Sequence, residues 1–364
     1  MDRGCKGAGA AHDTNMKKFL LSLALLVATS AMGVFAQNSL VATLNHNDTI
    51  KVYYGSNALK NAHSAAVDGD IITLSSGTFL ATNITKGITL RGAGAWPDTV
   101  AKRQPTVITG DFRIGVSNGV VSNQTIEGIY HNHTITYYGT SKNTNLIKNR
   151  LKTITQGSDQ WGHGVLTNAT VVHCYISTDS YFASSTINFQ NCVVNKPTNS
   201  SDGSMEYNNC LIGSINGKNS YNSTYTNCII YQEPRNGNQT SSAFGSSNMA
   251  YNCVNPSKVK DHPLFANIPN STNIYSTVAE VFKTYRSGAL ENNDSEVFEL
   301  TDSAKTTFLG VDGTQVGIYG GSFPFDRTVT VPQITKFEVA KQSTSDGKLN
   351  VNIEVNAAAE EPKK

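Results

Sequence analysis

The sequence predicts an all-β solenoid, in which short strands and turns form coils that stack along one axis. Five cysteines recur through the middle of the chain, the first four at equal intervals and the last after a longer one: Cys174, Cys192, Cys210, Cys228 and Cys253. Each lies in a similar frame, such as Tyr-Asn-Asn-Cys-Leu-Ile at 207–212. A period of about 18 residues is too short for a pair of helices and fits one coil of strands and turns.

The position before the cysteine predicts the turn of each coil. It holds asparagine in four of the five frames: Asn191, Asn209, Asn227 and Asn252. Asparagine tolerates the left-handed backbone that turns require, so we place it between two strands. Stacked asparagine side chains can also hydrogen-bond from coil to coil. Gly128 fits this position in an earlier coil, and residues 145–152 fit with about one residue of slack.

The cysteine and the residue two later share one strand face, which we place in the core. Five cysteines at one repeat position indicate a stack of small apolar side chains, with disulfide bridges as the alternative in an exported chain. No CxxC or histidine pattern accompanies them, so we expect no metal site. We also expect no cofactor. In this register the residue after each cysteine points outward and forms an apolar stripe: Tyr175, Val193, Leu211, Ile229 and Val254.

An apolar stripe of this length is seldom left bare on a soluble protein. We expect residues 263–325 to fold back over it, because they carry several large apolar side chains. The alternatives are a partner protein, a second copy of the chain, or a register that is wrong by one residue.

The N-terminal residues predict export. Lys17 and Lys18 precede a short apolar run at 19–27, and Val34-Phe35-Ala36 resembles a cleavage site, so we read 1–36 as an upstream extension plus a signal peptide that begins at Met16. Cleavage after Ala36 would give a secreted, cell-surface or periplasmic protein with no further membrane span. A retained membrane anchor is the alternative.

The rest of the chain divides by its pattern. Residues 37–325 form the solenoid, with a helix-like cap at 58–67, regular coils over about 71–256 and a less regular closing segment at 257–325 that holds a short helix near 277–286. Residues 326–357 read as a linker and a β-hairpin, with strands at 334–339 and 349–355, which resembles part of an immunoglobulin-like module. Residues 358–364 are expected to be a disordered tail.

Three segments together resemble a known family: residues 58–94, the Asn-Cys-x-Ile ladder, and Gly-Thr-Gln-Val-Gly-Ile-Tyr-Gly-Gly at 313–321. They resemble secreted right-handed parallel β-helix proteins of the pectin-lyase-like superfamily, and more narrowly such proteins of Bacteroidetes. The resemblance covers roughly residues 50–325. It implies the fold and leaves the activity open, since that superfamily holds lyases, hydrolases, adhesins and inert spikes.

Candidate site residues come from one basic strand and the loop after it. If Leu151 points inward, Lys148, Arg150 and Lys152 point outward together and could hold an anionic polysaccharide. Lys148, Arg150 and His163 are the candidate catalytic residues, with a Lys or Arg as proton acceptor, and Lys152 and Trp161 are the candidate substrate-binding residues. The plainer interpretation is a solvated basic face and a loop anchored by Trp161. His131, His133 and His173 lie within about two coils of this strand.

A short signal for O-glycosylation in Bacteroidetes is Asp, then Ser or Thr, then a small or aliphatic residue. It matches at three places, with Thr49, Thr99 and Ser303 as the acceptors.

Composition restricts the function. The formal net charge is +2, from 29 Lys+Arg and 27 Asp+Glu, which argues against a nucleic-acid-binding protein. The acidic residues near the repeats fall at different repeat positions, so no calcium-binding carboxylate ladder emerges. We therefore expect an exported β-helix protein that contacts a polysaccharide or cell-surface glycan without cleaving it. The alternative is a polysaccharide lyase or hydrolase that acts on an acidic polysaccharide. The oligomeric state stays open.

Overall fold

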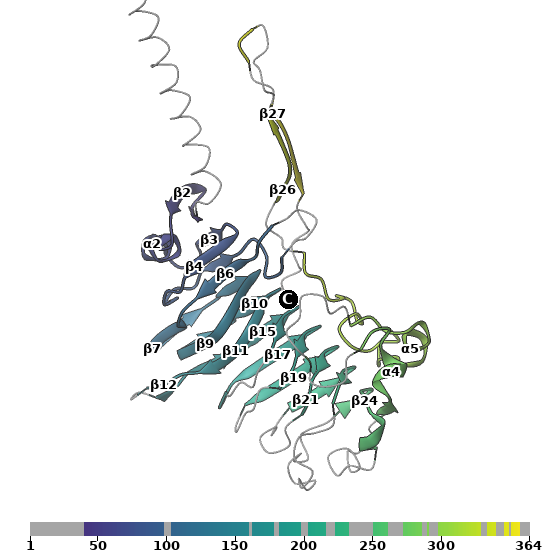
Figure 1. Ribbon diagram of the computed structural model, residues 1–364. Coiled ribbons are helices and arrows are strands. Elements are labelled where there is room, and N and C mark those ends of the chain that lie inside the picture. The colour runs from purple at the N-terminus through teal and green to yellow at the C-terminus, as the bar shows by residue number, and fades with distance from the viewer. Residues whose placement is uncertain are drawn as a thin grey trace, which may run out of the picture. The chain divides into compact units, whose positions relative to one another are not determined.

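The computed structural model describes residues 40–97, 103–159, 162–177, 182–197, 203–215, 223–232, 250–260, 272–285, 290, 298–328, 333–339, 346–348 and 351–356. It shows a parallel β-solenoid within a compact unit that spans Val41–Lys364 (Figure 1). The predicted signal peptide, Thr99, Trp161 and the C-terminal tail lie outside the described residues.

The first long sheet, sheet A, has eleven strands and runs along one side of the solenoid. Strand β1 is antiparallel to both β2 and β3, and from β3 onward each strand pairs with the next one in parallel. The strands are β2 (Thr49–Tyr54), β1 (Val41–His46), β3 (Ile71–Leu74), β5 (Thr89–Arg91), β8 (Thr125–Glu127), β10 (Asn145–Ile147), β15 (Ala169–Val172), β17 (Thr186–Gln190), β19 (Ser204–Asn208), β21 (Ser223–Thr226) and β23 (Ala250–Tyr251).

The second long sheet, sheet B, has twelve strands, and in each regular coil its strand follows the bend that ends the sheet A strand. Ten of its strands follow one path, and β7 and β14 join it by pairing with β9. The strands are β4 (Gly77–Leu80), β6 (Thr106–Thr109), β7 (Phe112–Ser122), β9 (Ile129–Lys142), β11 (Arg150–Gln156), β14 (Val165–Thr167), β16 (Tyr175–Ile176), β18 (Val193–Val194), β20 (Leu211–Ile212), β22 (Ile229–Ile230), β24 (Val254–Pro256) and β25 (Ile274–Ser276).

The cysteines form a stack at the point where each coil leaves the bend and enters sheet B. All five are fully buried and none is in a disulfide. The backbone N–H of Cys174 donates to Sγ of Cys192 at 3.4 Å, and the same bond recurs between Cys192 and Cys210 and between Cys210 and Cys228. Beside them in the core, the Phe189, Tyr207 and Tyr225 rings stack at centroid distances of 4.6 and 4.9 Å. The constant period of the repeat therefore places like side chains on top of each other.

The bend before each cysteine is left-handed. Asn191, Asn209, Asn227 and Asn252 have φ between 47° and 54°, as the repeat predicts. Gly128, Lys148 and His173 occupy the same position in earlier coils with φ of 66°, 53° and 52°. The coil-to-coil bonds expected of this ladder are not seen at Asn191 and Asn227, whose side chains instead contact the closing segment: Asn191 Nδ2 donates to the carbonyls of Ile318 and Gly320, and Asn227 Oδ1 accepts from the Val311 N–H.

The apolar stripe after the cysteines is covered by the closing segment, as the sequence predicts. The five stripe residues are at most 3% exposed and share one apolar cluster with the described part of the closing segment. Its members from that segment are Val281, Phe282, Leu290, Phe298, Leu300, Ala304, Phe308, Val316, Ile318 and Phe325. Leu151, Ile176, Val194, Ile212 and Ile230 point into the solenoid and are buried as well.

Short helices lie at the two ends. The α2 helix (Ala58–Ala65) coincides with the predicted helical segment at 58–67 and buries Leu59 and Ala62 against the first strands. The α4 helix (Val278–Val281) is shorter than predicted, because Phe282 is extended and forms a β-bridge with Leu300. The 3-10 helix η2 (Ser257–Val259) and the α5 helix (Asp302–Thr307) complete the set within the described residues. None of these helices is long and apolar enough to cross a membrane.

Two hairpins flank the solenoid in sequence. The β1–β2 hairpin is not among the elements predicted above, although its turn at Asn47 and Asp48 has the two positive φ angles of a tight hairpin turn. The predicted C-terminal hairpin is present as β26 (Gln333–Val339) paired with β27 (Val351–Asn356).

Candidate functional site

Lys148 does not lie on an exposed basic face. It occupies the left-handed bend before β11, and its side chain is only 1% exposed. Its ammonium donates to Asp326 Oδ2 at 3.2 Å and to the carbonyl oxygen of Thr328 at 2.7 Å. Burial opposes ionisation of Asp326, but hydrogen bonds from Thr328 and the charge of Lys148 outweigh it and hold the pKa of that carboxyl below its usual range. The expectation of a solvent-facing Lys148 is wrong.

Arg150 is also largely covered. It begins β11 at the stripe position, paired with Tyr175 in the next coil, and is 7% exposed. Its guanidinium lies 4.6 Å from the centre of the Tyr130 ring, which is a cation–π geometry. Only Lys152 of the three basic residues is exposed. The predicted basic face is therefore reduced to one solvent-exposed side chain.

His163 lies beyond the other end of β11. It is exposed on β13 (Gly162–His163), which pairs with β12 (Ser158–Asp159) in a small hairpin. Strand β11 has seven residues, so Arg150 and the hairpin are separated by about 20 Å of extended chain. Lys148 and Arg150 therefore do not converge with His163. Trp161 lies outside the described residues.

The other histidines have structural surroundings. His131 is fully buried and its Nδ1 lies 2.7 Å from the Ile108 carbonyl oxygen. Burial lowers the pKa of His131, which keeps the ring neutral at pH 7. His173 occupies a bend position, and its Nε2 lies 2.9 Å from the Phe323 carbonyl oxygen. His133 is exposed beside His131, with their ring centres 5.8 Å apart.

An aromatic side chain missed by the sequence analysis lies at the base of the β12–β13 hairpin. Tyr138, near the end of β9, is half-buried, and Gly157 packs directly against its ring. Any side chain at position 157 would collide with that ring. The Gly157 N–H donates to the Tyr137 carbonyl at 2.6 Å, and Gly164 N–H donates to the Gly157 carbonyl at 2.9 Å. These bonds fix the hairpin that carries His163 beside Tyr138.

A cation accompanies this ring. The guanidinium carbon of Arg113, on β7, lies 5.6 Å from the Tyr138 ring centre. Arg113 is half exposed and its Nη2 is 3.9 Å from Asp111 Oδ2, so the pair is held loosely at the surface. We call Arg113, Tyr138 and Gly157, together with the hairpin that carries His163, the Tyr138 platform. Its signal in the sequence is weak, because nothing in the order of residues indicates that β7 and β9 pair here.

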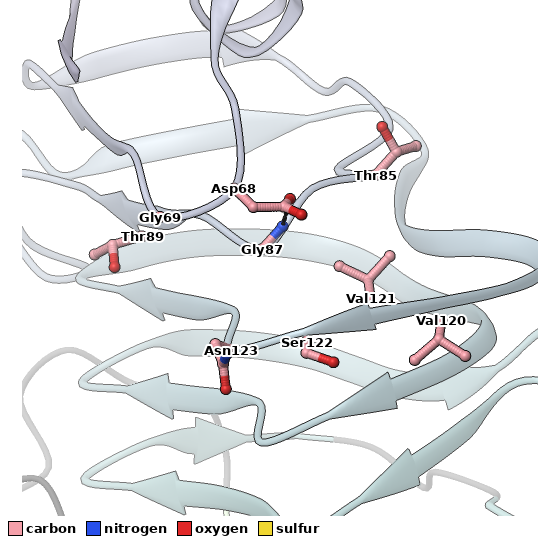
Figure 2. Close-up of a pocket in the computed structure, with 9 residues that line it drawn as sticks. All are labelled: Asp68, Gly69, Thr85, Gly87, Thr89, Val120, Val121, Ser122 and Asn123. Atoms are coloured by element: carbon pink, nitrogen blue, oxygen red, sulfur yellow. Dashed lines mark hydrogen bonds between the residues drawn. The ribbon is translucent and has the colours of Figure 1, made fainter. Parts of the chain in front are cut away.

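A small polar pocket of about 270 Å³ lies beside the bends that precede β3, β5 and β8 of sheet A (Figure 2). Figure 2 shows the Asp68 carboxylate directed at the Gly87 N–H, to which its Oδ1 is hydrogen-bonded at 2.7 Å. The other lining residues are Gly69, Thr85, Thr89, Val120, Val121, Ser122 and Asn123. The lining offers hydroxyl and amide groups but no aromatic face for a sugar ring. The Tyr138 platform is therefore the better candidate for carbohydrate contact.

Next to this pocket runs a second asparagine ladder that the sequence analysis did not find. Asn123, Asn143 and Asn168 all have left-handed backbones, with φ between 53° and 60°. Asn143 Nδ2 donates to Asn123 Oδ1 at 3.1 Å, and Asn168 Nδ2 donates to Asn143 Oδ1 at 2.8 Å. The coil-to-coil bonding expected of the first ladder is thus made here, on the exposed corner that precedes sheet A.

Two of the three predicted O-glycosylation acceptors lie among the described residues. Thr49 begins β2 and Ser303 lies in the first turn of α5, and both are exposed. Within the described part of the chain, no group of His, Cys, Asp and Glu side chains is placed to hold a metal ion.

Comparison with protein-family models, with curated proteins and with solved structures found no match to this chain.

Proposed function

We propose that this is an exported, non-catalytic β-helix protein of the pectin-lyase-like type that contacts a glycan through the Tyr138 platform. The observation that carries the proposal is the half-buried Tyr138 ring, which packs against Gly157, is accompanied by Arg113 and lies at the base of the hairpin that carries His163. Aromatic faces suit the apolar faces of pyranose rings, while guanidinium and imidazole groups donate hydrogen bonds to sugar hydroxyls or carboxylates.

The contacts that the predicted catalytic groups make within the chain favour binding over cleavage. Lys148 donates to Asp326 and Thr328, and Arg150 stacks on Tyr130. A proton acceptor in lyase chemistry must come within hydrogen-bond reach of the substrate, and these two groups lie under other parts of the chain. The Tyr138 platform itself offers a stacking surface and hydrogen-bond donors, which are the parts of a binding site.

The test is affinity measurement against a panel of neutral and uronic-acid polysaccharides, with the chain that begins at Gln37. Tyr138→Ala should weaken binding about tenfold, which corresponds to about 1.4 kcal/mol, while Tyr138→Phe should retain most of it. Tyr285→Ala is the matched control, because Tyr285 is 54% exposed on a different part of the surface.

Equal binding by the wild type and Tyr138→Ala, at unchanged thermal stability, would overturn the platform as the site. Release of unsaturated sugars from any uronic-acid polysaccharide would overturn the non-catalytic assignment in favour of a lyase.

A further inference from the structure

Strand β2 leaves an open edge on sheet A. It is the outermost strand and pairs with β1 alone, so among the described residues its other edge has no strand partner. An unpaired edge presents alternating N–H and C=O groups that can hydrogen-bond to another strand. The shielding devices that usually protect such edges are weak here, since β2 carries one lysine and no proline.

The outer face of β2 is apolar. Ile50, Val52 and Tyr54 alternate along the strand and are 65%, 45% and 67% exposed. They pair with Asn45, Thr43 and Val41 of β1, on the face opposite to the buried Ala42 and Leu44. An open edge and an exposed apolar row on the same six-residue strand together indicate a site for strand addition.

The sequence of β2 is complementary to itself in one antiparallel register. With Val52 opposite Val52, Ile50 lies opposite Tyr54 on the apolar face, and these are favourable cross-strand pairs. On the other face Lys51 lies opposite Tyr53, which separates the two lysines and sets each ammonium beside an aromatic ring.

Other two-fold registers fit less well. A register centred on Lys51 would place two like charges directly opposite each other, which is destabilising. A shift by one residue would set the apolar row of one strand against Lys51 and Tyr53 of the other, because opposed residues point to the same face. A register centred on Tyr53 aligns fewer residues.

From this edge, its apolar row and the charge arrangement of Lys51, we infer that β2 pairs with β2 of a second copy of this chain, antiparallel and with Val52 at the two-fold axis. The pairing joins two copies of sheet A into one continuous sheet. Such an interface is isologous and closes at two copies, so it gives a dimer and no longer polymer. The inference does not depend on glycan binding.

The first experiment is cysteine cross-linking in the chain that begins at Gln37, whose five native cysteines are buried. Directly opposed Cβ atoms in an antiparallel pair lie about 4.5–5.5 Å apart, close enough for a disulfide after small adjustment. Val52→Cys should form a disulfide-linked dimer on mild oxidation. Leu80→Cys, at a site that is 48% exposed on β4, is the matched control and should stay monomeric on a non-reducing gel.

The second experiment measures molar mass by light scattering. The wild type should be a dimer, and Val52→Lys should be a monomer with unchanged circular dichroism, because two lysines would then face each other at the axis. Val67→Lys, at a position 51% exposed outside β2, should remain a dimer.

A monomeric wild type overturns the inference, as does a dimer that survives Val52→Lys. A monomer whose β2 amides are protected from hydrogen exchange would likewise overturn it, by showing that another part of the chain covers the edge.

Discussion

At the residue scale, Lys148 shows how one misplaced side chain misdirects a functional prediction. The slack of one residue at 145–152 leaves its repeat position undecided in the sequence, where it reads as part of a strand with Arg150 and Lys152. In the structure Lys148 takes the asparagine position of the bend, and Asn149 takes the cysteine position, where its backbone N–H lies 3.4 Å from Cys174 Sγ. A lysine there reaches back to Asp326 and Thr328.

Lys148→Ala should therefore lower the free energy of unfolding by about 1–3 kcal/mol, because it leaves the Thr328 carbonyl and Asp326 without this donor. Lys152 is an exposed residue of β11. Lys152→Ala should change the free energy of unfolding by no more than about 0.5 kcal/mol. Urea denaturation of both variants is the measurement. Equal effects would mean that the Lys148 contacts add nothing to stability.

The burial of His63 predicts that the fold loses stability in acid. Burial, with a smaller contribution from the charge of Lys86, lowers the pKa of His63 from 6.5 to about 4. The unfolded chain thus takes up a proton at this residue between about pH 6.5 and pH 4 that the folded chain refuses, so stability falls as the pH falls through that window. The loss is about 3 kcal/mol and levels off below pH 4.

The measurement is the free energy of unfolding of the wild type and His63→Gln across this window. The wild type should show the steeper decline. His131, whose pKa is lowered in the same direction, contributes to the decline in both proteins. Parallel pH profiles would contradict a buried, neutral His63.

At the element scale, the repeat makes the contacts between coils predictable from the sequence, but it does not predict the contacts that occur only once. Cysteine spacing and Asn-Cys pairs report contacts between adjacent coils, which recur once per coil and so appear as a pattern. The pairing of β7 with β9, which builds the Tyr138 platform, occurs once and leaves no periodic trace. The same limit applies to Asn191, whose partners Ile318 and Gly320 lie far away in sequence.

Asn191→Gly isolates the side-chain bonds of the bend, since glycine adopts the left-handed backbone without strain. It should cost about 1–2 kcal/mol of stability, because the carbonyls of Ile318 and Gly320 each lose a donor. Asn252→Gly is the matched control, because Asn252 is half-buried at the equivalent bend of a later coil, with φ of 47°. Thermal denaturation should show a clear drop in Tm for the first variant only; similar values for both would assign no stability to the bonds with the closing segment.

At the scale of the whole molecule, the closing segment completes the solenoid. It buries the apolar stripe and contacts the bends in reverse order, with Val311 on Asn227, Ile318 and Gly320 on Asn191, and Phe323 on His173. A coil in a simple solenoid touches only its neighbours. Here the closing segment contacts several coils.

A chain that ends at Lys260 lacks this cover and should expose the stripe. We expect it to aggregate or to bind a hydrophobic dye strongly, because the stripe residues would then face water. A chain that ends at Thr328 keeps the cover and should bind dye as weakly as the full chain. A well-behaved, dye-negative chain ending at Lys260 would show that the stripe is protected without the closing segment.

The reverse-order contacts of the closing segment also decide when the molecule can finish folding. The bond between Asn191 and Ile318 spans 127 residues, and that between Lys148 and Thr328 spans 180. Contacts between adjacent coils span about 18 residues and can nucleate early, whereas these long loops must wait until the coils they cross are stacked. We therefore expect the docking of the closing segment to be the last step of folding. Until that step the stripe would be open to water, and the newly synthesised chain would be most exposed to proteases and to aggregation.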